Sequence, residues 1–459
     1  MSDLLDEVLA KVRPTSLERK RIEDVAEAVL SKIEELAGAK GVECRVMMVG
    51  SAARNTWLAG DHDLDIFIGV PVGSDLNAAL DLAREVAPQH EERYAEHAYV
   101  HARVGGFELD MVPCYLVEDA SQIMSAVDRT PFHNRYVSSR IGGMEDEVLL
   151  LKQFMKGVNV YGSELKVGGF SGYLAEILVI RYRSFLGVLE GACLWRPDEV
   201  IDLEGHSALA HRDPLVVTDP VDPRRNVAAA LSLDNMFRFA AAARSFLNLP
   251  LLEYFFPLPA EPLTDEELIG WLKRRKSTVI LAEFRAPDQV EDVIFPQLRK
   301  AEQAVLNLFE RNGFSTLRSD VDLHGDVSDG IGLVRMVFEL EVGRLPEVRK
   351  HVGPFIWDAK NVERFVSRHP EPISGPYVED GRAVVEVARK YTTAIQLLRS
   401  QMTGLSMGKH LSQEMQRGYK IYLGRELVQV RDEEFRRFLA RYFSAREEIC
   451  RSPQEKQSQ

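Results

Sequence analysis

The chain has 459 residues, of which 45% are hydrophobic and 28% are charged, and its formal net charge is −13. This composition indicates a globular protein of roughly three domains, and it lacks both the run of about 20 apolar residues that spans a bilayer and the order of a signal peptide, so we expect a cytoplasmic protein with no membrane partner. The acidic balance argues against non-specific nucleic-acid binding, except along a local basic track.

A mixed α/β domain is predicted for residues 1–142. A capping box at 15–18 precedes apolar residues at helical spacing, which predicts an amphipathic helix over about 16–37 that Gly38 closes. Short strand-like runs follow at 44–49, 64–70, 100–104 and 107–112. Only the Gly-Gly pair at 105–106 separates the last two runs, and this pair predicts a tight hairpin.

A mostly helical central domain is predicted for residues 143–256. The Gly-Gly pair at 142–143 interrupts the chain before this region. Apolar residues then recur on one face of a helix, at Val148, Leu151, Phe154 and Met155. Three prolines between 257 and 262 mark the end of the domain.

An α+β region is predicted for residues 257–459. A second capping box, at 264–267, begins a helix. Apolar and mostly polar residues alternate over 334–342, which predicts a half-buried strand, and Asp380-Gly381 predicts a hairpin. We expect the polar end after Arg451 to be disordered.

The four cysteines are far apart in the sequence, and none belongs to a C-x-x-C pair. They are Cys44, Cys114, Cys193 and Cys450. This spacing argues against a disulfide framework and against a zinc knuckle, so we expect four buried apolar side chains.

Two carboxylates share one face of a predicted strand. Asp63 and Asp65 alternate with apolar residues, so they project together and repel each other unless a cation lies between them. Magnesium fits, because it takes oxygen ligands and keeps positions open for substrate phosphates. The Gly-Ser turn at 50–51 supplies backbone N–H groups and a hydroxyl that suit a phosphate, whereas an isolated D-x-D pattern is more often the polar end of a strand.

A third carboxylate lies in the predicted strand at 107–112. If this strand lies beside the strand of Asp63 and Asp65, Asp110 completes a triad that can hold two metal ions. Glu108 and Asp61 remain alternatives for that role.

Three acidic residues on two strands, after a Gly-Ser turn, resemble the pattern of the nucleotidyltransferase superfamily that includes DNA polymerase β, poly(A) polymerases and tRNA nucleotidyltransferases. Longer stretches resemble the archaeal, class I CCA-adding enzymes. These stretches are 93–101, 110–115, 125–133, 168–173 and 219–228. They occur in order between about residues 40 and 235, and the third region matches more thinly, chiefly over 287–298 and at Gly408-Lys409.

The resemblance implies a multidomain fold and a reaction. The expected parts are a polymerase β-like nucleotidyltransferase domain, a helical central domain that binds nucleotide and tRNA, and an α+β C-terminal tRNA-binding region. The expected activity is template-independent addition and repair of the 3′-terminal CCA of tRNA from CTP and ATP, with Mg²⁺ at a two-ion site and release of pyrophosphate. The partners would be the acceptor stem and 3′ end of tRNA, and a homodimer is expected.

The resemblance also implies roles for ten residues. The catalytic, metal-binding carboxylates would be Asp63, Asp65 and Asp110. The triphosphate-binding turn would contain Gly50, Ser51 and Arg54. The nucleotide pocket would be lined by His133, Lys152 and Tyr161. Arg224 matches an arginine that helps to recognise the incoming base together with the RNA backbone.

Simpler interpretations exist for several charged residues. Arg54 and Lys152 could be ordinary solvated charges. Arg224 could pair with Asp222 at the surface while Arg225 takes the inward position.

A pair of histidines and a run of basic residues can each be interpreted as functional or as ordinary surface residues. His97 and His101 are spaced like a helical metal pair, but the local pattern is that of a strand, so we do not expect zinc there. The basic run at 273–276 fits either contacts with tRNA phosphates or a solvated helix face.

Two competing functions predict different products. A poly(A) or oligoadenylate polymerase on the same catalytic platform would use ATP alone and make products of unbounded length. A catalytically silent RNA-binding module would show no metal-dependent turnover, but the presence of all three carboxylates argues against it.

Overall fold

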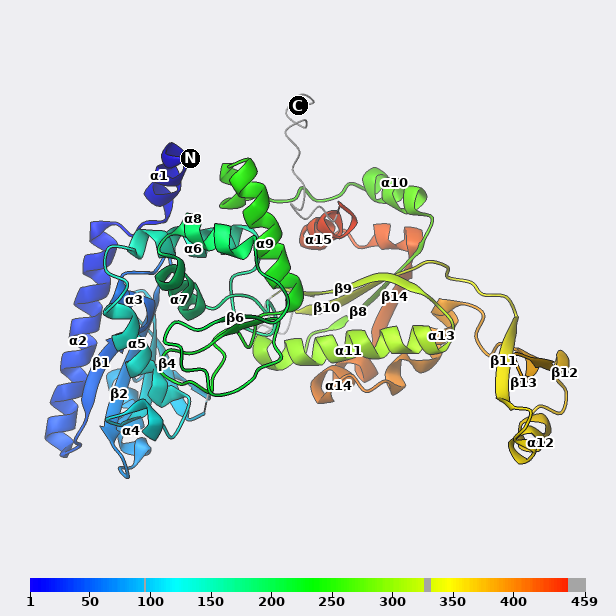
Figure 1. Cartoon of the computed structure of the whole chain (residues 1–459), viewed down its shortest axis with the longest axis horizontal. Helices are drawn as coiled ribbons and strands as arrows, with labels where there is room; N and C mark the ends of the chain where they lie inside the picture. The colour runs from blue at the N-terminus through cyan, green and yellow to red at the C-terminus, as the bar shows by residue number, and fades with distance from the viewer. Residues whose placement is uncertain (95, 326–331, 445–459) are drawn as a thin grey trace. The chain divides into compact units, whose positions relative to one another are not determined.

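The computed structural model describes residues 1–94, 96–325 and 332–444 (Figure 1). The chain forms two compact units, one of residues Met1–Leu258 and one that begins at Pro259, and each is described by itself. The predicted disordered end after Arg451, and Cys450, lie outside the described residues. No helix in the part that is described is both long and apolar enough to cross a membrane.

A five-stranded sheet organises the first part of unit 1. Its strands, in the order β1-β2-β5-β4-β3, are Arg45–Val49, Asp63–Pro71, Phe107–Leu116, Ala98–Val104 and Glu91–Tyr94. β2 and β5 run parallel, and the other neighbours are antiparallel. The four predicted strands and the hairpin at 105–106 are confirmed, whereas β3, α1 (Ser2–Val12) and α4 (Leu76–Val86) were not predicted.

Two helices cover one face of this sheet. α2 (Ser16–Lys40) and α4 bury Ile22, Ile33 and Leu80 against the apolar face of β2 and β5 (Figure 1). The other face carries acidic side chains where β2 begins and a small hydrophobic cluster farther along the strands. The capping box of α2 is confirmed. The predicted end at Gly38 is wrong, because Gly41, with a φ of 68°, adopts the left-handed conformation that closes the helix.

The rest of unit 1 is mostly helical, as predicted. Its longer helices are α5 (Thr130–Ser138), α6 (Glu145–Gly157), α7 (Gly172–Tyr182), α8 (Phe185–Ala192) and α9 (Leu233–Asn248), and β6 (Glu199–Ile201) pairs in parallel with β7 (Leu215–Val217). The prediction that α6 buries only one face is too narrow. Residues 148–152 are all buried, because α1, α7 and α8 surround the helix.

Unit 2 contains a four-stranded antiparallel sheet with helices on both faces. The strands, in the order β14-β8-β10-β9, are Tyr419–Leu423, Thr278–Arg285, Leu333–Leu340 and Thr316–His324. One face contacts α11 (Glu291–Arg311), α13 (Ala394–Gln401) and α14 (Lys409–Arg417), and the other contacts α10 (Asp265–Arg275) and α15 (Glu433–Ser444). The capping box that begins α10 is confirmed.

The expected half-buried strand at 334–342 is wrong in one respect. β10 is buried on both faces because it is a central strand, and its polar residues Arg335 and Glu339 are buried as ion pairs with Glu283 and Arg275. Beyond this sheet, β11 (Val348–Phe355), β12 (Ser374–Glu379) and β13 (Arg382–Ala388) form a small sheet with α12 (Ala359–Ser367). Its β12–β13 turn confirms the hairpin predicted at Asp380-Gly381.

The cysteines within the described residues are all free. Cys114 is buried, as predicted, but Cys44 and Cys193 are only partly buried, because both lie at the edge of a hydrophobic cluster.

Candidate active site

The parallel pairing of β2 and β5 brings the predicted carboxylates together. Asp65 lies opposite Asp110, and Asp63 lies opposite Glu108. Leu64 and Leu109, between these residues, are fully buried on the other face of the sheet. The condition on which the predicted acidic site depended, that the two strands are neighbours, is therefore met.

Burial and repulsion from neighbouring acids make Asp65 and Asp63 costly to ionise. Burial, together with the charges of Asp110 and Asp63, raises the pKa of Asp65 to about 6. Burial, together with the charges of Asp61, Asp110 and Glu108, also raises the pKa of Asp63. Carboxylates that repel one another in this way favour the binding of a cation.

His101 contacts the third carboxylate. It lies opposite Asp110 in the pairing of β4 with β5, and its Nδ1 atom is 2.6 Å from Asp110 Oδ1. Its Nε2 atom is 3.3 Å from Glu108 Oε2. His101 lies within strand β4, and His97 precedes it, so the two histidines do not form a helical pair.

The donor set of the acidic site suits a divalent cation such as magnesium, because it consists of carboxylate oxygens from adjacent strands. Among the described residues, no three His, Cys, Asp or Glu side chains lie close enough together to form a ready-made chelate. The carboxylates of β2 and β5 therefore fit a divalent cation that would draw them together when it binds.

Gly50 begins the short helix α3 (Gly50–Arg54), directly after β1. Its φ is 75°, and a Cβ atom built on it would lie 2.2 Å from Asp65 Oδ2. Only glycine allows this backbone conformation and this approach at once. The turn therefore places Ser51 and its neighbouring N–H groups next to the acidic site.

Arg54 and Lys152 are buried, not solvated. Their side chains are 7% and 3% exposed, and both contact Glu176 of α7, which is fully buried. The Arg54 guanidinium lies 2.9 Å from Glu176 Oε2 and donates to Asn134 Oδ1, and Lys152 Nζ donates to the carbonyl oxygen of Thr56 over 2.8 Å.

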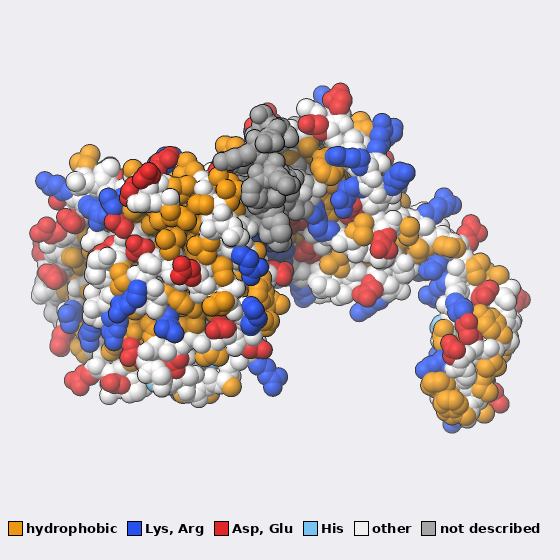
Figure 2. All heavy atoms as spheres, turned by 45° about the horizontal axis from the view of Figure 1, so that its top comes forward, with side chains coloured by type: hydrophobic (Ala, Val, Ile, Leu, Met, Phe, Trp, Pro, Cys, Tyr) orange, Lys and Arg blue, Asp and Glu red, His pale blue; other side chains and the backbone are white. Residues whose placement is uncertain are grey.

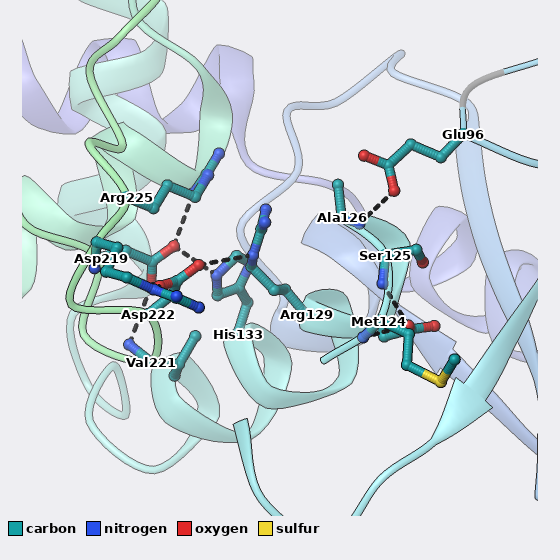
Figure 3. A network of polar contacts seen from close by, with 12 residues as sticks. Glu96, Met124, Ser125, Ala126, Arg129, His133, Asp219, Val221, Asp222 and Arg225 are labelled. Atoms are coloured by element: carbon teal, nitrogen blue, oxygen red, sulfur yellow. Dashed lines mark hydrogen bonds and ion pairs between the residues drawn. The ribbon is translucent and has the colours of Figure 1, made fainter. Parts of the chain in front are cut away.

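His133 and Arg225 converge on a second buried carboxylate, Asp219 (Figure 3). His133 Nε2 lies 2.8 Å from Asp219 Oδ2, and Arg225 Nη1 donates to the same oxygen over 2.7 Å. Burial alone would raise the pKa of Asp219, but the hydrogen bonds from His133, the Val221 backbone and Arg225 together lower it to about 2. The His133 ring also stacks on Tyr173, with 4.2 Å between the ring centroids.

Arg224 points outward, unlike its neighbour. Its side chain is 71% exposed and lies 3.9 Å from Asp222, whereas the Arg225 side chain is 35% exposed and contacts Asp219. Both arginines line a hollow of about 340 Å³ that also contains Ser171, His211 and Asn226.

Tyr161 adjoins the buried cations. It pairs with Phe170 in an isolated bridge, and its hydroxyl and Lys152 Nζ both lie close to Gly172. Burial, followed by the charges of Asp61 and Glu176, raises the pKa of Tyr161, so its hydroxyl stays a hydrogen-bond donor.

Glu176, Asp219 and His101 contact residues of the candidate site and were not predicted to belong to it. Glu176 had a visible signal, because it is a single carboxylate within the apolar run 174–180. Asp219 and His101 lie within stretches that carried the family resemblance, but nothing in their spacing identified their partners.

Three family models match consecutive parts of the chain. They are a nucleotidyltransferase domain over residues 28–133, the second domain of tRNA nucleotidyltransferases over 146–256 and the C-terminal domain of CCA-adding enzymes over 275–424. Nucleotidyltransferases of this kind generally use divalent metal ions.

Curated relatives match almost the whole chain. The CCA-adding enzyme of Methanosarcina barkeri is 45% identical and covers 95% of this chain and 97% of its own length. The CCA-adding enzyme of Methanothermobacter thermautotrophicus is 40% identical and covers 94% of this chain and 96% of its own length. A solved structure of the Cid1 poly(U) polymerase is 14% identical and covers 56% of this chain and 96% of its own, with a TM-score of 0.42.

Proposed function

The chain belongs to the family of CCA-adding enzymes, and we propose that it builds the 3′-terminal CCA of tRNA at the acidic site of β2 and β5. The family makes it a tRNA nucleotidyltransferase. The observation that supports the location is the register that sets Asp65 opposite Asp110, beside the turn at Gly50.

Asp63, Asp65 and Asp110 would hold two Mg²⁺ ions. When bound, such ions lower the pKa of the attacking hydroxyl and neutralise charge on the triphosphate. The carboxylates themselves position the reacting groups, and Asp110 is our candidate for the ligand closest to the attacking 3′-hydroxyl of the tRNA. That hydroxyl attacks the α-phosphorus of the nucleotide, a new phosphodiester bond forms, and pyrophosphate leaves.

The remaining residues would hold the nucleotide. The Ser51 hydroxyl and the backbone N–H groups after Gly50 donate to phosphate oxygens. Arg54 ends the helix that begins at Gly50, and both Arg54 and Lys152 are buried against Glu176, so they act on the triphosphate mainly through their charge. His133 and Tyr161 would complete the wall of the pocket.

Supplying CTP and ATP separately distinguishes CCA addition from the two competing functions. The protein is incubated with Mg²⁺, tRNA lacking its 3′ end and CTP, ATP or both, and the product lengths are read. We expect two additions with CTP and a third only when ATP is also present. Long products from ATP alone would instead identify a poly(A)-type polymerase, and no turnover with any nucleotide would identify a silent RNA-binding module.

Arg224→Ala is expected to narrow the preference for CTP over UTP. Cytosine has an acceptor at N3 where uracil has a donor, and an arginine offers only donors. The exposed Arg224 can reach a base in the adjacent hollow, so its loss should reduce the kcat/KM ratio of CTP to UTP by roughly 5- to 150-fold, or about 1–3 kcal/mol.

Arg225→Ala is the matched variant for this measurement. Because Arg225 is bound to Asp219, its loss should weaken both nucleotides together and leave the ratio unchanged. An unaltered ratio in Arg224→Ala, combined with a narrowed ratio in Arg225→Ala, would transfer the base-reading role to Arg225.

The affinity for tRNA is expected to fall with rising salt, in spite of the net charge of −13. Figure 2 shows Lys and Arg atoms interspersed with acidic ones. The last turn of α10 carries Lys273 and Arg274, both of which are exposed. Phosphates that meet such groups release counterions, so log Kd should rise linearly with log salt. A flat response in a filter-binding titration would show that the RNA is not held electrostatically.

A further inference from the structure

The most deeply buried charged cluster of unit 1 is built around Glu176. This residue lies in α7 between Ala175 and Ile177, and its side chain is fully buried. Taking a carboxylate out of water costs several kcal/mol, unless opposite charges and hydrogen bonds compensate for the loss. The partners of Glu176 therefore explain why a charge is found at this position.

Those partners come from three other parts of unit 1. Arg54 of α3 donates from Nε to Glu176 Oε1 over 3.1 Å, and its Nη2 atom forms an ion pair with Oε2 at 2.9 Å. The Thr56 hydroxyl donates to Glu176 Oε1. Lys152 Nζ of α6 lies 3.9 Å from the same oxygen.

Two cations around one anion leave the cluster with a surplus of one positive charge. We propose that Glu176 is a positioning residue of the nucleotide site, which holds Lys152 close to Arg54 of α3, the helix that begins at Gly50, so that this surplus charge faces the triphosphate. The inference rests on the proposed function, because it takes Arg54 and Lys152 as part of the nucleotide site. In this role Glu176 acts through Arg54 and Lys152 and does not itself bind the nucleotide.

The charge of Lys152 depends on this arrangement. Burial lowers the pKa of Lys152, the charge of Glu176 opposes that shift, and the charge of Arg54 adds to it. Asp61 raises the pKa and Lys156 lowers it. The ammonium group donates to the Thr56 carbonyl oxygen, and it lies close to Gly172, as the hydroxyl of Tyr161 does. Without the Glu176 charge, the pKa of Lys152 falls further, and Lys152 loses its proton at a lower pH.

The test is Glu176→Gln, which keeps the shape of the side chain and removes its charge. The Kd values of CTP and ATP are measured by calorimetry between pH 6.5 and 8.5, in two buffers with different ionisation enthalpies. We expect the Kd to rise by about tenfold per pH unit above the new pKa of Lys152 in the variant, relative to the wild type. The nucleotide's own titration is common to both proteins and cancels in this comparison.

The same titrations, compared between the two buffers, also give the number of protons that the protein takes up when a nucleotide binds. Nucleotide binding to Glu176→Gln should take up more protons than binding to the wild type, approaching one extra proton, because the triphosphate restores the charge of Lys152. The double variant Lys152→Met, Glu176→Gln should lose both the extra pH dependence and the extra proton uptake.

A matched control lies in unit 2. Glu339 is also fully buried and also accepts from an arginine and a hydroxyl, those of Arg275 and Ser277. Glu339→Gln should lower the melting temperature without changing the pH dependence of nucleotide binding. A loss of stability alone therefore cannot imitate the expected result.

Two results would overturn the proposal. One is a Glu176→Gln protein that binds CTP and ATP as the wild type does across the pH range. The other is a variant that binds nucleotides more weakly than the wild type by the same factor at every pH, which would make Glu176 merely structural. Because binding is measured without turnover, a wild-type protein that binds nucleotides but fails to extend tRNA would contradict the proposed function and leave this test intact.

Discussion

Asp65→Asn and Asp110→Asn should each abolish nucleotide addition and leave tRNA binding nearly unchanged. Each substitution removes one charge from the pair that the β2–β5 register sets face to face. Losing a ligand of a catalytic metal costs several kcal/mol of transition-state stabilisation, so we expect a fall of at least about 10³-fold in kcat/KM. Addition of labelled CMP to truncated tRNA measures this loss, and a tRNA-binding titration provides the control.

Asp65→Asn should also stabilise the metal-free protein. The pKa of Asp65 is raised to about 6 from an ordinary value of 3.8, so the folded state binds this proton more tightly than the unfolded state does. The folded protein therefore loses stability as the pH rises from about 4 to about 6, and the penalty remains in full above that range. With a chelator at pH 8, the melting temperature of Asp65→Asn should exceed that of the wild type, and this advantage should vanish below pH 4.

Retention of turnover would contradict the assignment. A variant of either aspartate that adds nucleotides at the normal rate in ordinary magnesium would remove that residue from the site. If Asp65→Asn were inactive but less stable than the wild type at pH 8, its inactivity would reflect a damaged fold and not a missing ligand.

The five-stranded sheet is partly predictable from the sequence, because β5 and the start of β2 alternate apolar and polar residues with a period of two, whereas β3 has no such pattern and was not predicted. The Gly-Gly pair at 105–106 likewise fixes a hairpin, since both positions need positive φ. Which strand lies beside β2 is not encoded locally. The parallel pairing of β2 with β5 depends on packing between residues about 45 apart, and the Asp65–Asp110 contact follows from that pairing.

The buried polar groups were the hardest to predict, for a related reason. The pattern of β10 suggests a half-buried strand, but Arg335 and Glu339 are buried because their partners come from β8 and α10. Arg54 looks like a surface charge for the same reason, since Glu176 is 122 residues away in the sequence. A charge that is paired across such a distance has no local signature, so its burial becomes evident only in the folded chain.

Gly50→Ala should cost at least about 100-fold in activity, although the change adds a single methyl group. The new Cβ would lie 2.2 Å from Asp65 Oδ2, so the Asp65 carboxylate or the turn must move by about an ångström. Misplacement of a reacting or metal-binding group by that distance typically costs roughly 10²-fold in rate. The φ of 75° adds about 1–2 kcal/mol of backbone strain for alanine.

Gly41→Ala separates the steric clash from the strain. Gly41 also has a positive φ, of 68°, but a Cβ atom there would meet nothing within 4 Å. Gly41→Ala should therefore lower the melting temperature about as much as the strain at Gly50 does, and it should keep full activity. If Gly50→Ala lost no more activity than Gly41→Ala, the close approach of the turn to Asp65 would have no part in catalysis. A Gly50→Ala protein that folds, binds tRNA and fails to add nucleotides would instead show that the turn and the carboxylate work as one unit, because the only new atom lies between them.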